Sequence, residues 1–217
     1  MSARWWATSL TVGASALACS DWGWTRVHKP YAAFELRAVT EEPDVFAAYS
    51  IDPESGAAAT RSCPDVDIRK ERVGPPGAGH DVSYAFSENE AALRECAKGA
   101  ETADTQILIT QSESGGKRSF RTYSVSWVPF LTGADIARAR IAQDHGDFAL
   151  ELELTPRGRT RLASYSASHV NQRMAIVLDA TVSAAPRIAS PPTGSRVSLF
   201  VADKTAAEML LRKLTGT

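Results

Sequence analysis

The sequence is short of the residues from which most catalytic and metal sites are built. Its 217 residues include only four histidines and three cysteines, and neither type has the ligand spacing of a zinc site. No Gly-x-Ser-x-Gly turn of the hydrolase type occurs. Asp144-His145-Gly146-Asp147 groups two carboxylates with an imidazole, but such a polar run is also typical of a solvated turn. We therefore predict a protein that is not an enzyme and that has no metal and no cofactor.

An excess of charge of either sign is also missing. The formal net charge is −1, and the lysines and arginines are spread through the chain. Without a basic stripe there is no electrostatic support for nucleic-acid binding. The hydrophobic content of 44% and the charged content of 23% are ordinary for a globular protein of one large domain or two small ones.

Residues 1–18 differ in composition from the rest of the chain. They contain no acid and one base, Arg4, and an apolar stretch follows that ends in small residues. This layout is typical of a secretory signal peptide, and the apolar run is too short to span a membrane. A buried N-terminal helix is the alternative interpretation.

The motif Ala16-Leu17-Ala18-Cys19 resembles the lipobox of bacterial lipoproteins, in which the cysteine is lipidated and becomes the new N-terminus. Ala16-x-Ala18 also fits an ordinary signal peptidase. Ser20, in place of an Asp, resembles signals that permit passage to the outer membrane. We expect residues 19–30 to be the lipidated cysteine and a tether. We expect the protein to be anchored in the outer membrane and to face the periplasm. A soluble periplasmic or secreted protein is the alternative.

The odd number of cysteines favours the lipoprotein, because three cysteines in an oxidising compartment leave one without a disulfide partner. If Cys19 carries lipid, Cys63 and Cys96 remain as one possible disulfide. Cys96 lies on the inner face of a predicted helix, so it could instead be a small buried hydrophobe.

Alternation and turn residues predict an α+β segment over 31–129. Strands are expected over 31–39, 63–73, 81–86, 106–110 and 119–128, with a loop over 111–118. A helix is expected to begin with a capping box formed by Ser87 and Glu90 and to end near Lys98. Residues 20–30 are the tether or, because they contain Trp22 and Trp24, an arm packed on the domain.

A second segment, 130–217, has a different order of elements. We expect a short helix capped by Thr132, and then strands and helices over 147–154, 156–171, 173–188, 196–201 and 203–214. Residues 173–188 predict a buried strand, a turn at Asp179-Ala180 and a second strand that Pro186 ends. This order predicts helices on one side of a mixed or antiparallel sheet.

The second segment resembles the head subdomain of the first periplasmic domain of SecD and SecF, accessory subunits of the bacterial protein-export channel. The matching motif positions are Leu131, Gly133 and Ile136, then Thr155 and Gly158, then Leu178, Asp179 and Pro186, and finally Gly194. The resemblance implies a domain that contacts unfolded or partly folded polypeptide outside the inner membrane. Shared fold alone does not establish shared function.

Two departures from that family affect what is expected. The family's glycine after the aspartate is Ala180 here, so the turn must differ or be strained. Nothing after Cys19 could span a bilayer, so the resemblance implies a stand-alone version without the membrane helices of the proton-driven motor. We expect a non-enzymatic envelope lipoprotein that binds polypeptide or a partner protein in or near export. The alternatives are a structural or assembly component of the envelope and a hydrolase that uses His145 or His169.

Overall fold

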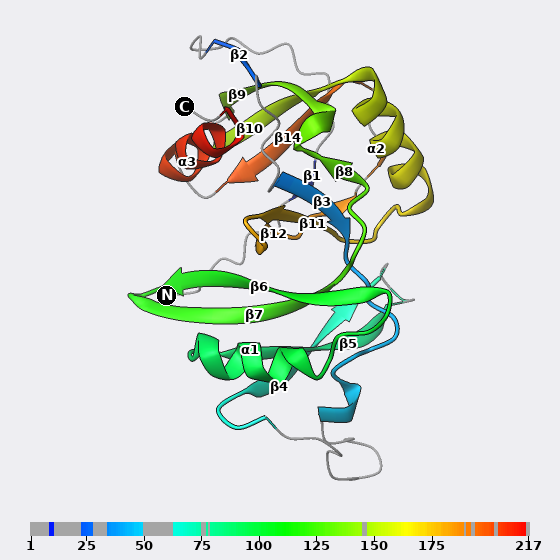
Figure 1. The fold of residues 1–217 in the computed structure, drawn as a ribbon, viewed down its shortest axis with the longest axis vertical. Helices are drawn as coiled ribbons and strands as arrows, with labels where there is room; N and C mark the ends of the chain where they lie inside the picture. Colours follow the sequence, from blue (N-terminus) through cyan, green and yellow to red (C-terminus); the bar gives the residue numbers. More distant parts are fainter. Residues whose placement is uncertain are drawn as a thin grey trace.

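The structure is a computed structural model that describes residues 9–10, 23–27, 34–49, 63–74, 77, 79–144, 147–188, 190–191, 194–201 and 204–215. Cys19, His145 and most of the predicted signal peptide lie outside these residues. Strands and three α-helices of the described ranges build an α+β fold (Figure 1), which confirms the predicted class. No helix in these ranges is long and apolar enough to cross a bilayer.

A mixed sheet of eight strands runs through the molecule in the order β4-β5-β7-β6-β12-β11-β3-β8. These strands are β3 (Phe34–Ala38), β4 (Asp67–Val73), β5 (His80–Ser87), β6 (Thr105–Ser114), β7 (Lys117–Ser126), β8 (Leu131–Thr132), β11 (Met174–Leu178) and β12 (Thr181–Ala184). All five residues of β11 are buried, as in a strand covered on both faces. The sheet unites strands of both predicted segments, and its two parts meet where β12 pairs in parallel with β6 at Thr181 and Ile109.

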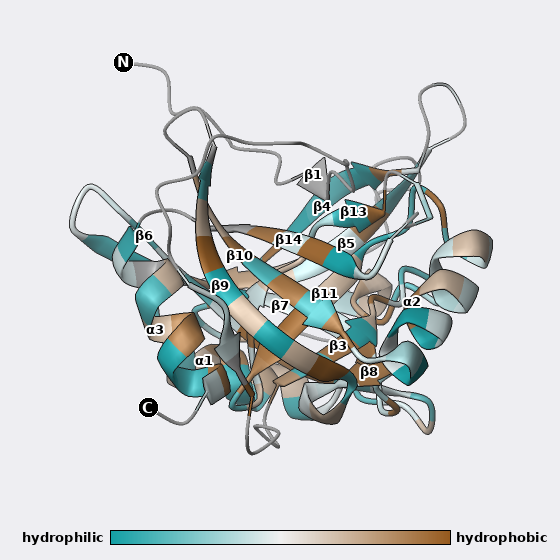
Figure 2. Ribbon diagram, turned by 90° about the horizontal axis from the view of Figure 1, so that it is seen from above, coloured by the Kyte–Doolittle hydropathy of each residue, from teal (hydrophilic) through white to brown (hydrophobic). Residues whose placement is uncertain are grey.

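A second sheet of four strands has the order β14-β10-β9-β2. Its members are β2 (Thr25–Arg26), β9 (Ile136–Asp144), β10 (Asp147–Leu154) and β14 (Arg196–Val201). Polar and apolar residues alternate along β9 and β10. The view from above in Figure 2 looks onto the outer face of this sheet, which none of the described helices covers. A small parallel pair joins β1 (Ser9–Leu10) to β13 (Arg187–Ile188).

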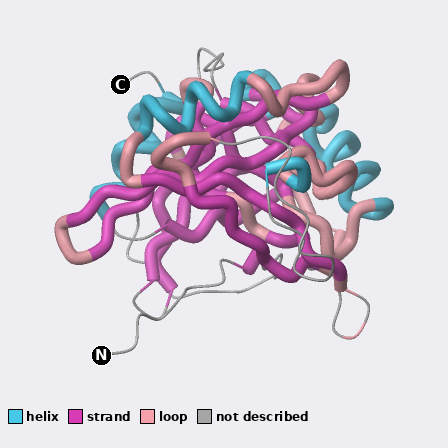
Figure 3. The backbone as a smooth tube through the Cα atoms, turned by 90° about the horizontal axis from the view of Figure 1, so that it is seen from below, coloured by secondary structure: helices cyan, strands magenta, loops and turns pink. Residues whose placement is uncertain are grey.

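The helices lie around the strands rather than between them (Figure 3). Helix α1 (Glu90–Lys98) contacts β5, β7 and β6, whereas α2 (Pro156–Ser168) and α3 (Lys204–Thr215) flank the four-stranded sheet. Short 3₁₀ helices occur at η1 (Ala47–Tyr49) and η2 (Gly133–Asp135).

Two large apolar cores follow from this arrangement. One fills the space between the inner face of the four-stranded sheet, β3, β11 and the helices α2 and α3, with buried side chains such as Leu150, Leu162 and Ile176. The other packs α1 through Leu93 against Phe120 and the strands around it. The strand alternation predicted over 147–154 therefore places its leucines in the first core, as expected.

Residues 136–144 correct the predicted course of the second segment. The short helix expected after Thr132 is a single 3₁₀ turn, η2, and the chain then forms the long strand β9. Thr132 does form a capping box with Asp135. The turn is only three residues long because Arg and Ala or Ile alternate directly after it, which favours a strand with one wet face.

Three other boundaries also differ from the prediction. The loop expected over 111–118 is mostly strand, because β6 and β7 continue to a tight turn at Gly115-Gly116 with φ values of 60° and 75°. Helix α1 is capped by Asn89, whose Oδ1 accepts from two backbone amides, rather than by Ser87. Helix α2 ends at Ser168 instead of residue 171.

Candidate functional site

The family-motif residues Leu131, Gly133 and Ile136 flank a buried acidic residue in the sequence, Asp135, which is only 2% exposed. Its Oδ2 accepts a hydrogen bond from the backbone N of Thr132 at 3.1 Å and from Arg161 Nη1 at 3.2 Å. A buried carboxylate costs free energy unless it is paired and hydrogen-bonded, and this one is both. The group is therefore a structural joint between η2 and helix α2.

The other motif pair, Thr155 and Gly158, lies at the start of α2 and contacts the backbone of Asp135 in η2. Thr155 caps α2 by accepting from the Gly158 backbone N at 3.1 Å, as predicted, and its own N donates to the carbonyl of Asp135 at 2.8 Å. A Cβ on Gly158 would lie 2.4 Å from that carbonyl oxygen. The glycine is needed because the helix approaches η2 too closely for any side chain.

For the turn after Leu178 the sequence predicted either a different turn type or a strained backbone, and the structure has the strained backbone. Asp179 and Ala180 have φ values of 49° and 59°, in the left-handed region that an Ala rarely adopts. Lys213 Nζ lies 2.6 Å from Asp179 Oδ2, which ties α3 to this turn.

Two further motif positions serve the backbone. The carbonyl of Pro186 accepts from the N of Met174 at 2.9 Å and so holds the segment after β12 beside β11. At Gly194 an added Cβ would meet no atom nearer than 4.0 Å. The motif positions thus support the fold, and a ligand-binding role for them finds no support in their contacts.

A charged cluster connects distant parts of the chain around Glu71 on β4. Its carboxylate accepts hydrogen bonds from Arg121 on β7 and from Arg173, which directly precedes β11. The Arg121 guanidinium also lies over the rings of Tyr84 and Tyr123, at 3.8 and 4.7 Å from their centroids. Burial alone would raise the pKa of Glu71, but the hydrogen bonds and positive charges of the two arginines outweigh it and lower that pKa.

Glu41 lies near the same cluster and behaves in the opposite way. Burial raises its pKa, although Arg173 and Arg187 act to lower it. Its Oε1 is buried, and no described residue gives that atom a hydrogen bond. Two neighbouring carboxylates therefore have pKa values displaced in opposite directions by their surroundings.

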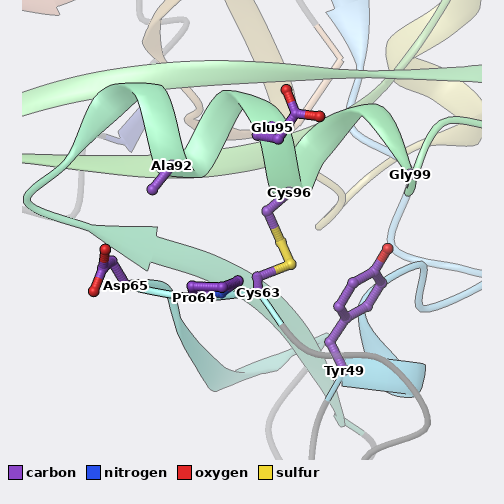
Figure 4. Close-up of a pocket in the computed structure, with 8 residues that line it drawn as sticks. All are labelled: Tyr49, Cys63, Pro64, Asp65, Ala92, Glu95, Cys96 and Gly99. Carbon is purple, nitrogen blue, oxygen red and sulfur yellow. A yellow bond between two sulfur atoms is a disulfide. The ribbon is translucent and has the colours of Figure 1, made fainter.

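The structure joins Cys63 and Cys96 by a disulfide, with their Cα atoms 5.6 Å apart. Beside this bond lies an open pocket of about 540 Å³ (Figure 4). Its lining is mostly apolar and consists of Tyr49, Cys63, Pro64, Ala92, Cys96 and Gly99, together with the acidic residues Asp65 and Glu95. The disulfide forms part of the wall, so the pocket depends on the bond between α1 and the segment that contains Cys63.

The outer face of the four-stranded sheet carries a second group of polar residues. Glu151 and Glu153 point outward, as their alternation predicted, and pair across the strands with Arg140 and Arg138 at 2.7 Å each. Trp24 lies over these arginines, because β2 pairs with β9 at the edge of the sheet. Residues 23–27 are therefore a packed arm, the alternative to the expected free tether.

The histidines of the described ranges do not assemble a catalytic group. His169 is the C-cap of α2, where its ring stacks on Tyr165 with the centroids 4.0 Å apart, and the Tyr165 ring stacks on Phe130 at 3.8 Å. Within the described residues, no three side chains of His, Cys, Asp or Glu could hold a metal ion.

Comparison with known proteins agrees with this geometry. The family model of the SecDF P1 head subdomain matches residues 105–212, from the start of β6 to α3. The chain carries a SecDF P1 head subdomain. The head subdomain contains the joint around Asp135, the strained turn at Ala180 and both charged strands of the outer face.

Curated relatives of this chain are SecDF proteins. The protein translocase subunit SecDF of Brucella abortus biovar 1 (strain 9-941) is 28% identical over 121 residues, which are 55% of this chain and 15% of the relative. The subunit of the same description from Thermus thermophilus is 39% identical over 69 residues, which are 31% of this chain and 9% of the relative. The chain thus spans only a small part of these relatives.

Two solved structures resemble the chain at 19% sequence identity. One is described as "Structure and function of a membrane component SecDF that enhances protein export", with a TM-score of 0.38 and coverage of 84% of this chain and 92% of that chain. The other is described as "Crystal structure of SecDF in Super-membrane-facing form", with a TM-score of 0.40 and coverage of 84% and 28%.

Proposed function

We propose that this chain is a non-enzymatic lipoprotein of the cell envelope that binds unfolded polypeptide in or near protein export. The observation that carries the proposal is the SecDF P1 head subdomain over residues 105–212. Relatives that match this chain are protein translocase subunits, whose work concerns polypeptide in transit.

The pocket beside the disulfide is the surface that best suits such a ligand. It is open, holds about 540 Å³, and presents apolar groups of Tyr49, Pro64 and Ala92. Concave, mostly apolar sites with a few polar groups are the usual form of binding sites. A folded protein buries its apolar side chains, whereas an unfolded one offers them, so this pocket would select unfolded chains.

The disulfide and the lipobox-like motif together support a position outside the cytoplasm. Disulfides persist in oxidising compartments such as the bacterial periplasm. Cys19 is the cysteine that the Cys63–Cys96 bond leaves over. We assign it the lipid anchor, and mass spectrometry of the mature N-terminus tests that assignment. An unmodified Cys19 would contradict the lipoprotein part of the proposal.

Binding of a reduced, carboxymethylated model protein, followed by fluorescence anisotropy, tests the polypeptide part. Ala92 lines the pocket and Ala91 does not, so Ala92→Arg and Ala91→Arg form a matched pair on one helix. We expect Ala92→Arg to weaken binding about tenfold or more, the loss of about 1.4 kcal/mol of contact, and Ala91→Arg to leave it within about twofold. Equal capture of the native and the unfolded model protein would count against selective binding of unfolded chains.

A further inference from the structure

Trp24 is held on the outer face of the four-stranded sheet. Its ring centroid lies 4.7 Å from the guanidinium carbon of Arg140, 5.2 Å from that of Arg196 and 5.5 Å from that of Arg138. The backbone fixes this place, because Thr25 pairs with Ala139 and the N of Val27 donates to the carbonyl of Ala137 at 3.1 Å. An indole stacked on guanidinium groups is an aromatic ring set in a positively charged surface.

The charges of this face are unequal. Arg138 and Arg140 are matched by Glu153 and Glu151, but no carboxylate among the described residues forms an ion pair with Arg196. Helix α2, which begins directly after β10, adds further arginines and contains no acidic residue.

The arginines of α2 are Arg157, Arg159 and Arg161. The buried carboxylate of Asp135 forms ion pairs with Arg157 and Arg161. Positive charges in the first turns of a helix oppose its dipole. This end of the molecule therefore carries a surplus of positive charge that helix stability does not explain.

The short distance in sequence between Cys19 and Trp24 would explain a positively charged face at this end of the molecule. Only five residues lead from Cys19 to Trp24, so the two cannot be more than about 17 Å apart even in a fully extended chain. A lipid on Cys19 therefore holds the Trp24 face close to the bilayer. This step rests on the proposed lipid anchor.

We propose that the outer face of the four-stranded sheet docks on the anionic phospholipid headgroups of the membrane that holds the anchor. The guanidinium of Arg196 and those at the start of α2 would bind phosphate oxygens, for which their planar fork is well suited. Trp24 would lie at the level of the headgroups, where tryptophan is enriched in membrane proteins.

This docking orients the rest of the molecule. Figure 1 shows β2, β9 and β10 at one end of the long axis and α1 with β4 at the other. The pocket beside the disulfide is lined by α1, so it would face away from the membrane. A polypeptide could then reach it from the surrounding solution without passing the bilayer surface.

Sedimentation with lipid vesicles tests the proposal without the anchor. The full chain with Cys19→Ser is mixed either with vesicles of phosphatidylcholine or with vesicles that also contain phosphatidylglycerol. We expect binding to the anionic vesicles that falls as salt is raised, since exposed charges are screened. Residues 1–18 are the same in every variant, so their own contribution to vesicle binding cancels when the variants are compared.

Arg196→Glu should weaken binding to the anionic vesicles at least fivefold, about the effect of one arginine near such a surface. Trp24→Ala should weaken it as well. Arg72→Glu makes the same change of charge on β4 at the other end of the molecule, where its side chain is 66% exposed, and should have no effect. If Arg196→Glu disturbs the fold, as a thermal melt would reveal, Arg159→Glu on the exposed side of α2 takes its place.

Equal binding to both kinds of vesicle would overturn the proposal, and so would equal loss in Arg196→Glu and Arg72→Glu. Competition by a carboxymethylated model protein for the vesicle-binding face would also overturn it and would assign that face to polypeptide. An unmodified Cys19, in contrast, would remove the anchor and leave the vesicle result standing, so the two failures can be told apart.

Discussion

Glu71 and Arg173 lie 102 residues apart in the sequence, and their side chains form two hydrogen bonds, one of them 3.0 Å long. Arg121 on β7 bonds the same carboxylate, so the cluster connects the edge strand β4 to β7 and to the residue that precedes the interior strand β11. Removing this partly buried acceptor leaves two guanidinium groups without their partner.

Glu71→Gln should therefore lower the free energy of unfolding by about 2 kcal/mol, the usual cost of losing hydrogen bonds to charged groups. Chemical denaturation measures it. Glu90→Gln is the control, because Glu90 forms an exposed pair with Arg94 on α1 and should cost less than about 0.5 kcal/mol. Equal effects of the two substitutions would contradict a stabilising role for the cluster.

The two displaced carboxylates predict opposite dependences on pH. The pKa of Glu71 is lowered from 4.5, so its contribution to stability is complete above the unfolded pKa and is lost as the pH falls through the folded one. The pKa of Glu41 is raised from 4.5, so the native state holds that proton more tightly and loses stability as the pH rises through the raised value.

Unfolding midpoints from roughly pH 3 to pH 7 separate these contributions. Glu71→Gln should flatten the acid limb of the stability profile, and Glu41→Gln should flatten the decline above the ordinary pKa of 4.5. If both variants changed the same limb, the assignment of at least one carboxylate would be wrong.

The disulfide closes a loop with a sequence separation of 33 residues. On the chain-entropy account, a bond of that span stabilises the fold by about 3–4 kcal/mol. We expect the double variant Cys63→Ser, Cys96→Ser to lose that amount in a thermal or denaturant melt. A reducing agent should bring the parent chain to the stability of the double variant and leave the variant itself unchanged.

Ala180→Gly should raise the stability of the protein. The φ of Ala180 is 59°, and a left-handed conformation costs a residue with a Cβ about 1 kcal/mol that glycine does not lose. A gain of about 1 kcal/mol in denaturation is expected. The matched control is Ala167→Gly on the exposed side of α2, where the same exchange should cost about 1 kcal/mol. A loss of stability in Ala180→Gly would show that the turn is not strained.

Gly158→Ala should destabilise the protein, although the same substitution usually stabilises a helix. The new Cβ would lie 2.4 Å from the carbonyl oxygen of Asp135 and 2.8 Å from its Cβ, which forces α2 away from η2. We expect a loss of about 3 kcal/mol or more. Ser164→Ala, on the exposed face of the same helix, should stay within about 0.5 kcal/mol of the parent.

The sequence was sufficient to predict the strands and helices that are specified by neighbouring residues. The run of apolar residues over 174–178 and the Asp-Ala pair after it predicted a buried strand and its turn, and Thr155 followed by Pro156 predicted the start of α2. These signals depend on neighbouring residues, so no tertiary context was needed to interpret them. The strain at Ala180 was one of two alternatives expected from a different source, the glycine that the resembled family has at this position.

The strand β9 was missed although its signal is present. Arg138 and Arg140 alternate with Ala139 and Ile141, a two-residue period with one wet face. Alanine is a weak marker of an apolar face and a strong helix former, so the pattern did not stand out. Without β9, the partners of Glu151 and Glu153 could not be identified either.

The charged cluster around Glu71 could not have been predicted from a single sequence. Arg121 and Arg173 lie 50 and 102 residues further along the chain, and no periodicity links such distances. The place of Trp24 on the outer face has the same cause, because it depends on the pairing of β2 with β9.

The pairing of β3 with β11 has a consequence for how the chain folds. Ala38 lies opposite Met174, so a strand near one end of the sequence needs a partner from the last fifth of it. Contacts between such distant residues form slowly, since closing the long loop costs entropy before the contacts repay it. The eight-stranded sheet therefore cannot be completed until residues 174–178 have been synthesised, so the first half of the chain must wait for its central partner strand.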